Sequence, residues 1–134
     1  KSVLKEDGIN DNSLKNFHIF ENTTTVNIDD LRKRFGMNSW AVRIAYNELF
    51  AGVIIQQRPG EGNRKHFHPE ADENWVILDG EWEWWIENKG VKRVKQNDIV
   101  VVPKGIWHQI KCIGNSPGVR YAITIPDVNH VYEK

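Results

Sequence analysis

Three histidines and a group of carboxylates are the residues in this sequence whose types and spacing suggest chemistry. His66 and His68 are separated by one residue, so in a β-strand both side chains project from the same face. Three carboxylates follow within residues 70–73, and His108 lies forty residues beyond His68. Imidazoles and a carboxylate suit a divalent transition metal, and four protein donors on a six-coordinate ion leave two positions open for reaction. From the residues alone, two ordinary polar histidines in a strand are the alternative.

Short β-rich segments must position these side chains. They recur after Gly36 and are separated by turn signals such as Asp79-Gly80 and Asn97-Asp98. Many short strands at regular spacing predict an all-β sandwich or barrel, because a parallel sheet would need crossover helices for which the chain has no room. The predicted strands are 40–46, 50–58, 64–68, 73–78, 81–87, 91–95, 98–102, 106–112 and 119–125.

The N-terminal region has a different texture. Residues 1–22 are polar and irregular, and we interpret them as an arm. Residues 28–35 predict a short helix, with Asn27 as its N-terminal cap and Gly36 at its end. We therefore expect an arm and short helix over 1–36, packed on a barrel formed by 37–134, in one domain.

Composition narrows the classes of partner. The 134 residues carry 18 basic and 18 acidic side chains, and this balance argues against nucleic acid or an anionic membrane as a partner. No apolar run approaches the ~20 residues that cross a bilayer, and no signal peptide is visible. A single cysteine, Cys112, allows no internal disulfide, which favours a reducing compartment and predicts a cytoplasmic location. Because the chain begins at Lys1, a trimmed N-terminus stays open.

The residues around the histidines resemble the two sequence motifs of the cupin superfamily. The first motif is read in Gly60-x5-His66-x-His68-x4-Glu73-x6-Gly80, and the second in Pro103-x-Gly105-x2-His108. The resemblance spans about residues 50–126. It departs from the family at the start of the second motif, where Asn97 replaces a glycine, and at its end, where Cys112 replaces an asparagine. Asn tolerates the left-handed conformation of a turn, and Cys112 is interpreted as a small apolar residue.

This resemblance implies a double-stranded β-helix, or jelly-roll barrel, with one divalent metal ion. By family spacing, the implied ligands are His66, His68, Glu73 and His108. The carboxylates Glu70 and Asp72 would then be turn residues, or partners of the histidine ring N–H groups. Fe2+ is the favoured metal, and Mn2+, Ni2+ and Zn2+ are alternatives.

Several further side chains are candidates for binding substrate. Arg64 shares the parity of His66 and could bind an anionic group beside the metal, although a surface position in its loop is an equal alternative. Trp82 and Trp84 are predicted to face inward, whereas Trp85, on the acidic face of the same strand, would be exposed or lie in a subunit contact. Trp75, Trp82 and Trp84 pack in the core or form an aromatic wall for a ligand. Gln57 and Tyr121 are weaker candidates, and His130 is interpreted as an ordinary residue of the C-terminal tail.

Three functions are consistent with these residues. The first is an enzyme acting on a small, polar and anionic molecule, as an Fe(II)-type dioxygenase or oxidoreductase. The second is a non-redox isomerase, epimerase or lyase acting on a sugar-like or carboxylate substrate, for which the sequence names no acid or base. The third is a non-catalytic module that binds a small molecule. A homodimer is one option for the assembly.

Overall fold

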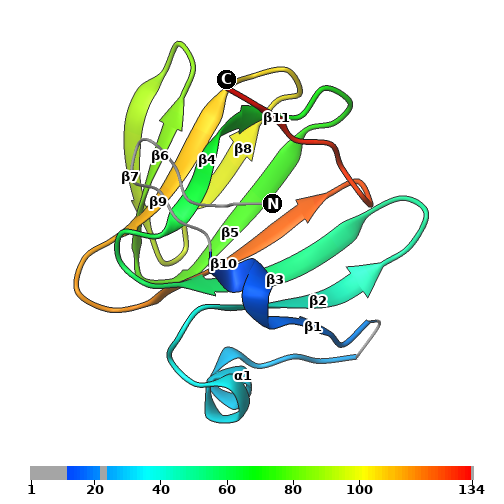
Figure 1. Ribbon diagram of the computed structural model, residues 1–134, viewed down its shortest axis with the longest axis vertical. Coiled ribbons are helices and arrows are strands. Elements are labelled where there is room, and N and C mark those ends of the chain that lie inside the picture. Colours follow the sequence, from blue (N-terminus) through cyan, green and yellow to red (C-terminus); the bar gives the residue numbers. More distant parts are fainter. Residues whose placement is uncertain (1–11, 22–23, 134) are drawn as a thin grey trace.

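The chain folds into two β-sheets that face each other, with one helix outside them (Figure 1). The computed structural model describes residues 12–21 and 24–133. The larger sheet has the order β1-β2-β3-β10-β5-β8, and the smaller one β11-β4-β9-β6-β7. Every pairing is antiparallel except that of β1 with β2. The strands are β1 (Phe17–Ile19), β2 (Trp40–Tyr46), β3 (Ala51–Gln57), β4 (Gly62–Phe67), β5 (Glu73–Asp79), β6 (Glu81–Ile86), β7 (Gly90–Lys95), β8 (Ile99–Val102), β9 (His108–Ile113), β10 (Gly118–Thr124) and β11 (Val131–Tyr132).

This architecture confirms the predicted jelly roll. Each of the predicted strands is present, with ends that differ by at most two residues. The turn at Asn97 has a φ of 79°, so asparagine does adopt the left-handed conformation where the family usually has glycine. Gly80 also has a positive φ, of 82°, and a Cβ there would lie 2.5 Å from the Cα of Gly118. The β5–β6 turn therefore needs glycine for both its conformation and its close contact.

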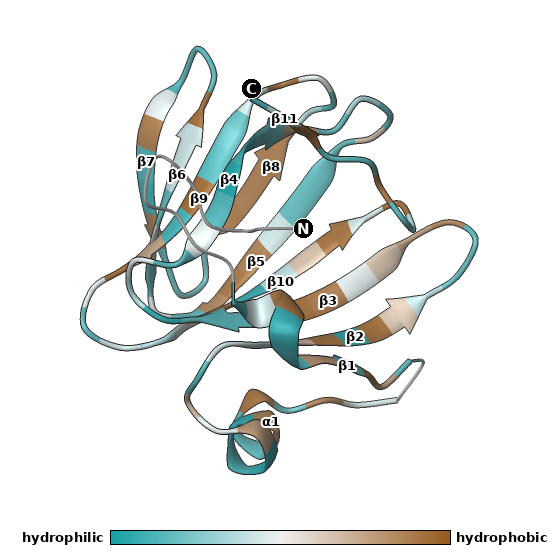
Figure 2. Cartoon of the chain, in the orientation of Figure 1, coloured by the Kyte–Doolittle hydropathy of each residue, from teal (hydrophilic) through white to brown (hydrophobic). Residues whose placement is uncertain are grey.

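The predicted helix is α1 (Ile28–Phe35). Its cap is Asn27, whose Oδ1 accepts hydrogen bonds from the backbone N–H groups of Asp29 (2.8 Å) and Asp30 (3.2 Å). The helix ends at Gly36, with a φ of 88°. Its apolar side faces the larger sheet and its hydrophilic side faces away (Figure 2). Leu31 is buried there in a cluster on the outer face of this sheet, together with Trp40, Val42, Ile54 and Val119.

The N-terminal arm is less irregular than expected. Residues 1–11 lie outside the described part of the chain, but Ser13–Asn16 forms a 3-10 turn, η1, and β1 then pairs in parallel with β2. The buried carboxylate of Glu61 anchors this segment, since it accepts hydrogen bonds from Asn12 Nδ2 (2.7 Å) and from Ser39 Oγ. These hydrogen bonds lower the pKa of Glu61, although burial opposes them. The arm is therefore fixed against the barrel and can form part of its interior wall.

One side of the barrel interior is densely packed. Trp75, Trp82 and Trp84 lie there with exposures of 1% or less, in a core cluster supplied by β5, β6, β8, β9 and β10. Figure 2 shows β8 coloured hydrophobic along its length. Cys112 is buried in the same cluster, as expected of a small apolar residue. No helix in the described part of the chain is long and apolar enough to span a membrane.

Candidate metal centre

Three buried histidines converge inside the barrel. His66 near the end of β4 pairs directly with His108 at the start of β9, and His68 follows β4 by one residue. Their side chains are 0–2% exposed, and one ring nitrogen from each lies within 4.8 Å of the others. The same-face prediction for His66 and His68 is therefore confirmed, and antiparallel pairing brings in His108 from forty residues away.

Backbone carbonyls fix the orientation of all three imidazoles. His68 Nδ1 lies 2.9 Å from the carbonyl oxygen of Asn129, and His108 Nδ1 lies 3.0 Å from that of Ile106. His66 Nδ1 contacts the carbonyl of Arg64 in the same way. A carbonyl can only accept a hydrogen bond, so the Nδ1 of each ring must carry the proton. When each ring is neutral, Nε2 is left with the lone pair that a metal ligand needs.

The carboxylate of Glu73 lies against the histidine cluster. This inward-facing residue at the start of β5 is 8% exposed, and its Oε1 lies 2.6 Å from Nε2 of His68. In the neutral tautomer of His68 both atoms are acceptors, so this distance requires a proton or a metal ion between them. The Nε2 of His108 is buried and makes no hydrogen bond. A cation bound by the Nε2 atoms of His68 and His108 and by Oε1 of Glu73 would give each of these buried atoms a partner. The residues present therefore fit a divalent metal.

Electrostatics prepare two of the rings as neutral ligands. Burial lowers the pKa of His66 to about 2 and that of His108 to about 4, from an ordinary value of 6.5. Burial also acts on His68, but the adjacent Glu73 carboxylate outweighs it and raises the pKa. His68 is therefore the ring that holds the shared proton when no metal is present. A metal ion must displace this proton in order to bind.

The two neighbouring carboxylates support the site from the loop after β4. Glu70 accepts hydrogen bonds from the backbone N–H (2.8 Å) and the Nδ2 (3.0 Å) of Asn129, whose carbonyl in turn orients His68. Asp72 accepts a hydrogen bond from the backbone N–H of Lys104 (2.8 Å). Both are turn residues, which is the first of the two expectations from the sequence. Neither is a direct partner of a histidine N–H group, because backbone carbonyls take that role.

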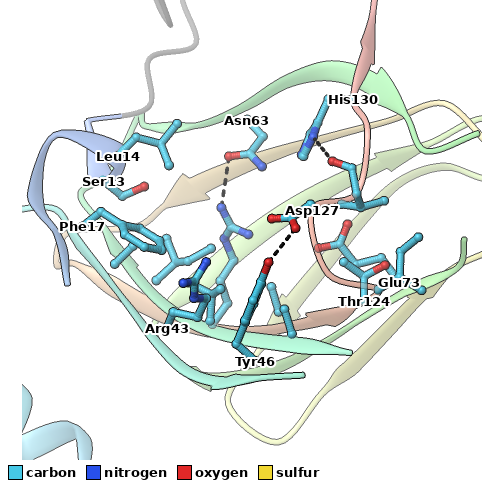
Figure 3. Close-up of a pocket in the computed structure, with 18 of the residues that line it drawn as sticks. Ser13, Leu14, Phe17, Arg43, Tyr46, Asn63, Glu73, Thr124, Asp127 and His130 are labelled. Carbon is cyan, nitrogen blue, oxygen red and sulfur yellow. Dashed lines mark hydrogen bonds between the residues drawn. The ribbon is translucent and has the colours of Figure 1, made fainter. Parts of the chain in front are cut away.

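A cavity of about 430 Å³ meets the centre at Glu73 and His130 (Figure 3). Its floor is the inner face of β2, β3 and β10, and its other walls come from β4, the arm and the C-terminal segment. A β-bulge in β4 lies between Asn63, which pairs with Ile110, and His66, which pairs with His108. The extra residue lets adjacent Asn63 and Arg64 both line the cavity, which a regular strand would not allow.

Arg64 lies at this cavity, which is one of the two positions that the sequence left open. Its guanidinium is 5.0 Å from the centre of the Tyr132 ring, and it has no acidic partner among the described residues. Arg43, which also lines the cavity, is already paired with Glu21. Arg120, on the cavity floor, donates hydrogen bonds to Gln57 Oε1 (2.9 Å) and Asn63 Oδ1 (3.1 Å). The cavity lining thus combines three arginines with the carboxylates of Glu73 and Asp127, and Arg64 is paired with no carboxylate of the described residues.

Of the two interpretations of the three tryptophans, core packing is the one that the structure shows, and the aromatic wall for a ligand is not present at this cavity. Trp75, Trp82 and Trp84 do face inward, but they fill the packed side of the barrel and do not line the cavity. The reason is their large apolar area, which is most stabilising where no water or ligand can reach it. Trp75 nevertheless contacts the ring of His108, with centroids 5.5 Å apart, and so supports a metal ligand. Trp85 is half-buried on the outer face, with Lys65 Nζ 4.3 Å from its ring centre.

Two weaker substrate candidates also lie elsewhere. Gln57 is fully buried and does not line the cavity, although its hydrogen bond positions Arg120, which does. Tyr121 belongs to the cluster on the outer face of the larger sheet, because odd-numbered residues of β10 point away from the interior. Its ring covers Gly52, where a Cβ would lie 2.2 Å from the tyrosine hydroxyl. Neither side chain can touch a ligand in this cavity.

His130 lies at the site, although sequence reasoning treated it as an ordinary residue of the tail. Its ring is 4.9 Å from that of His66 and 4.6 Å from that of His68, measured between centroids, and it lines the cavity. The strand that brings it there, β11, has only two residues and pairs with β4. A lone histidine in a polar tail gives no local signal, so only the long-range β4–β11 pairing could have revealed it.

Comparisons with known proteins agree with this geometry. The family model described as "Cupin domain" matches residues 53–124, which is more than half of the chain. Germin-like protein subfamily 1 member 19 of Arabidopsis thaliana is 27% identical over 137 aligned positions, covering 90% of this chain and 57% of the relative. The chain thus spans about half the length of the curated germin-like relatives it matches.

Solved structures show the same fold at low sequence identity. An uncharacterized conserved protein with a double-stranded β-helix domain from Klebsiella pneumoniae has a TM-score of 0.69 and 20% identity, covering 84% of this chain and 94% of that one. The DMSP lyase DddQ from Ruegeria pomeroyi has a TM-score of 0.59 and 22% identity, covering 74% and 53%. With both motifs, the barrel and the family match in agreement, this chain belongs to the cupin family.

Proposed function

We propose that this chain is a metal-dependent enzyme that acts on a small anionic molecule, as an Fe(II)-type dioxygenase. The observation that carries the proposal is the convergence of His66, His68, His108 and Glu73 next to a cavity with an arginine that has no acidic partner. A purely structural metal site needs neither a cavity nor a cation beside it.

Each part of the site has a distinct task in this proposal. Bound Fe2+ would supply the electron transfer that lets dioxygen react, with both oxygen atoms entering the substrate. Arg64 binds the anionic group of the substrate and so fixes its orientation. Apolar side chains of the cavity floor, such as Val53, Ile55 and Ala122, exclude water from the remaining part of the bound substrate.

Metal analysis tests the centre itself. Purified full chain should contain about one metal ion, and His66→Ala or His108→Ala should remove it, because each variant deletes a buried donor. His18→Ala is the matched control, since His18 stacks on Phe35 with centroids 3.9 Å apart and is not part of the cluster. Equal metal content in all four proteins would refute the ligand assignment.

Oxygen consumption tests the reaction. The Fe2+-loaded chain should consume oxygen when mixed with members of a panel of small carboxylates, measured with an oxygen electrode. Turnover without oxygen uptake would instead indicate a non-redox isomerase, epimerase or lyase. Binding without turnover would indicate a non-catalytic module.

The role of Arg64 is tested by the same carboxylates. Arg64→Gln should weaken their binding by at least about tenfold, because it removes a charge-assisted hydrogen bond. Arg93→Gln is the control, since Arg93 is exposed and lies beside Glu83 on the small sheet. Unchanged affinity in Arg64→Gln would contradict an anionic substrate held at this position.

A homodimer and a cytoplasmic location stay predictions. Light scattering on purified protein distinguishes a mass near 15.6 kDa from twice that value. Fractionation of cells that express the native gene tests the location.

A further inference from the structure

His130 lies as close to two metal ligands as those ligands lie to each other. The ring centroids of His66 and His68 are 4.9 Å apart, and those of His66 and His108 are 4.3 Å apart. The His130 ring is 4.9 Å from His66 and 4.6 Å from His68. His130 therefore lies beside these two ligands.

His130 also makes the same kind of hydrogen bond that orients two of the buried ligands. Its Nδ1 lies 3.2 Å from the carbonyl oxygen of Val128, two residues earlier in the chain (Figure 3). His66 and His108 each make this contact with the carbonyl two residues before them. Because the carbonyl only accepts, Nδ1 of His130 carries the proton and Nε2 carries the lone pair. The ring is thus in the tautomer that binds metals through Nε2.

The segment around His130 is tied to the centre on both sides. Asn129 is held by Glu70 and orients His68 through its carbonyl, so the residue before His130 is part of the ligand framework. On the other side, Tyr132 pairs with His66 in the β4–β11 ladder and stacks on His130, with ring planes 16° apart. His130 itself is exposed, unlike the three buried histidines.

We propose that His130 is a fourth imidazole donor, which takes one of the two metal positions that the four buried donors leave open. The inference rests on the proposed function only in that it requires a metal at this centre. Because the ring is exposed and extends from a short terminal strand, it can be replaced without disturbing the core. The centre therefore has one exchangeable protein ligand, and a small anion entering the cavity competes with it for the metal.

Counting the water molecules on a bound Mn2+ ion tests this proposal. Water-proton relaxation of the Mn2+-loaded full chain measures the number of exchangeable waters on the ion, and titration gives the Mn2+ affinity. His130→Ala should add one water and weaken Mn2+ binding by at least about tenfold, since a ligand is lost. Free imidazole should reverse both effects in the variant. His18→Ala, which loses an imidazole away from the centre, should match the wild type.

The possible results separate the inference from the proposed function. A wild-type chain that binds no Mn2+ refutes both. A wild-type chain that binds Mn2+ while His130→Ala has the same water count and affinity overturns only the role of His130. His130→Gln serves as a second variant, because its amide can still donate a hydrogen bond to Val128 and keep the segment in place. The inference requires the same extra water in His130→Gln, and its absence there also overturns the role.

Discussion

The stability of the metal-free protein should depend strongly on pH between 7.5 and 5.5. Burial lowers the pKa of His66 to about 2 and that of His108 to about 4, whereas an unfolded histidine titrates near 6.5. Below pH 6.5 the unfolded chain therefore takes up protons that the folded chain excludes. The unfolded state binds more protons, so the free energy of unfolding is largest above pH 6.5 and falls as the solution becomes more acidic.

The expected size follows from the proton-binding equilibria. At pH 5.5, one unit below the unfolded value, each excluded proton costs about 1.4 kcal/mol, and the cost at pH 7.5 is close to zero. The two buried rings together should lower the free energy of unfolding by roughly 3 kcal/mol over this range. His68 acts in the opposite direction, because Glu73 raises its folded pKa, and it offsets part of the loss.

Urea denaturation in the presence of EDTA measures this effect at both pH values. The comparison protein is the double variant His66→Gln and His108→Gln, which lacks both titrating rings but keeps polar side chains. The quantity compared is the change in the free energy of unfolding between the two pH values, and not the absolute stability of either protein. The wild type should lose roughly 3 kcal/mol more than the double variant. Equal losses in the two proteins would show that the buried rings are not held neutral and would refute the reasoning.

Four further outcomes follow from particular contacts. Metal binding near neutral pH should release up to roughly one proton, because the ion displaces the proton between His68 and Glu73. Calorimetry in buffers of different ionisation enthalpy measures the number of protons released, and a value of zero would contradict the shared proton. Gly62→Ala should destabilise the fold by at least about 2 kcal/mol in urea denaturation, since the added Cβ would lie 1.9 Å from the backbone oxygen of Ile110. An unchanged denaturation midpoint would show that β4 and β9 can move apart at no cost. Asn27→Ala should cost about 1 kcal/mol in the same assay through loss of the α1 cap, and Asn27→Ser should recover most of it. Burial raises the pKa of Cys112 to about 11, from 9.0. At pH 8 the native thiol should therefore react with a disulfide reagent at least about a hundredfold more slowly than the thiol of the unfolded chain, and similar rates would place Cys112 at the surface.

The strands and the ligand set could be predicted because their signals are local. Alternating apolar residues and turn residues define β2 to β10, and the glycines and proline around His66, His68, Glu73 and His108 give the cupin spacing. The cap of α1 was equally readable, since Asn27 and Gly36 flank a single short apolar pattern. Local patterns thus recovered most of the barrel and the buried centre.

The remaining features depend on contacts between distant segments. Neither β1 nor β11 is long enough to show a pattern, and each forms because β2 or β4 offers an edge for pairing. The position of His130 follows from that second pairing. The tryptophans were correctly predicted to face inward, but the sequence left core packing and a ligand wall as alternatives. Orientation follows from strand parity, whereas the location of a cavity depends on how all side chains pack together.

The unequal filling of the barrel also bears on how such a protein can change. Stability is concentrated in the tryptophan side, where a lost side chain leaves a void in a dense core. Several residues that border the cavity, such as Val53, Arg64 and Tyr132, are only half-buried. Substitutions there remove little buried area, so they cost little folding free energy while they alter the shape and charge that a ligand meets. The packed side therefore acts as a frame, and the half-buried positions around the cavity are open to redesign, by selection or in the laboratory, for new small molecules.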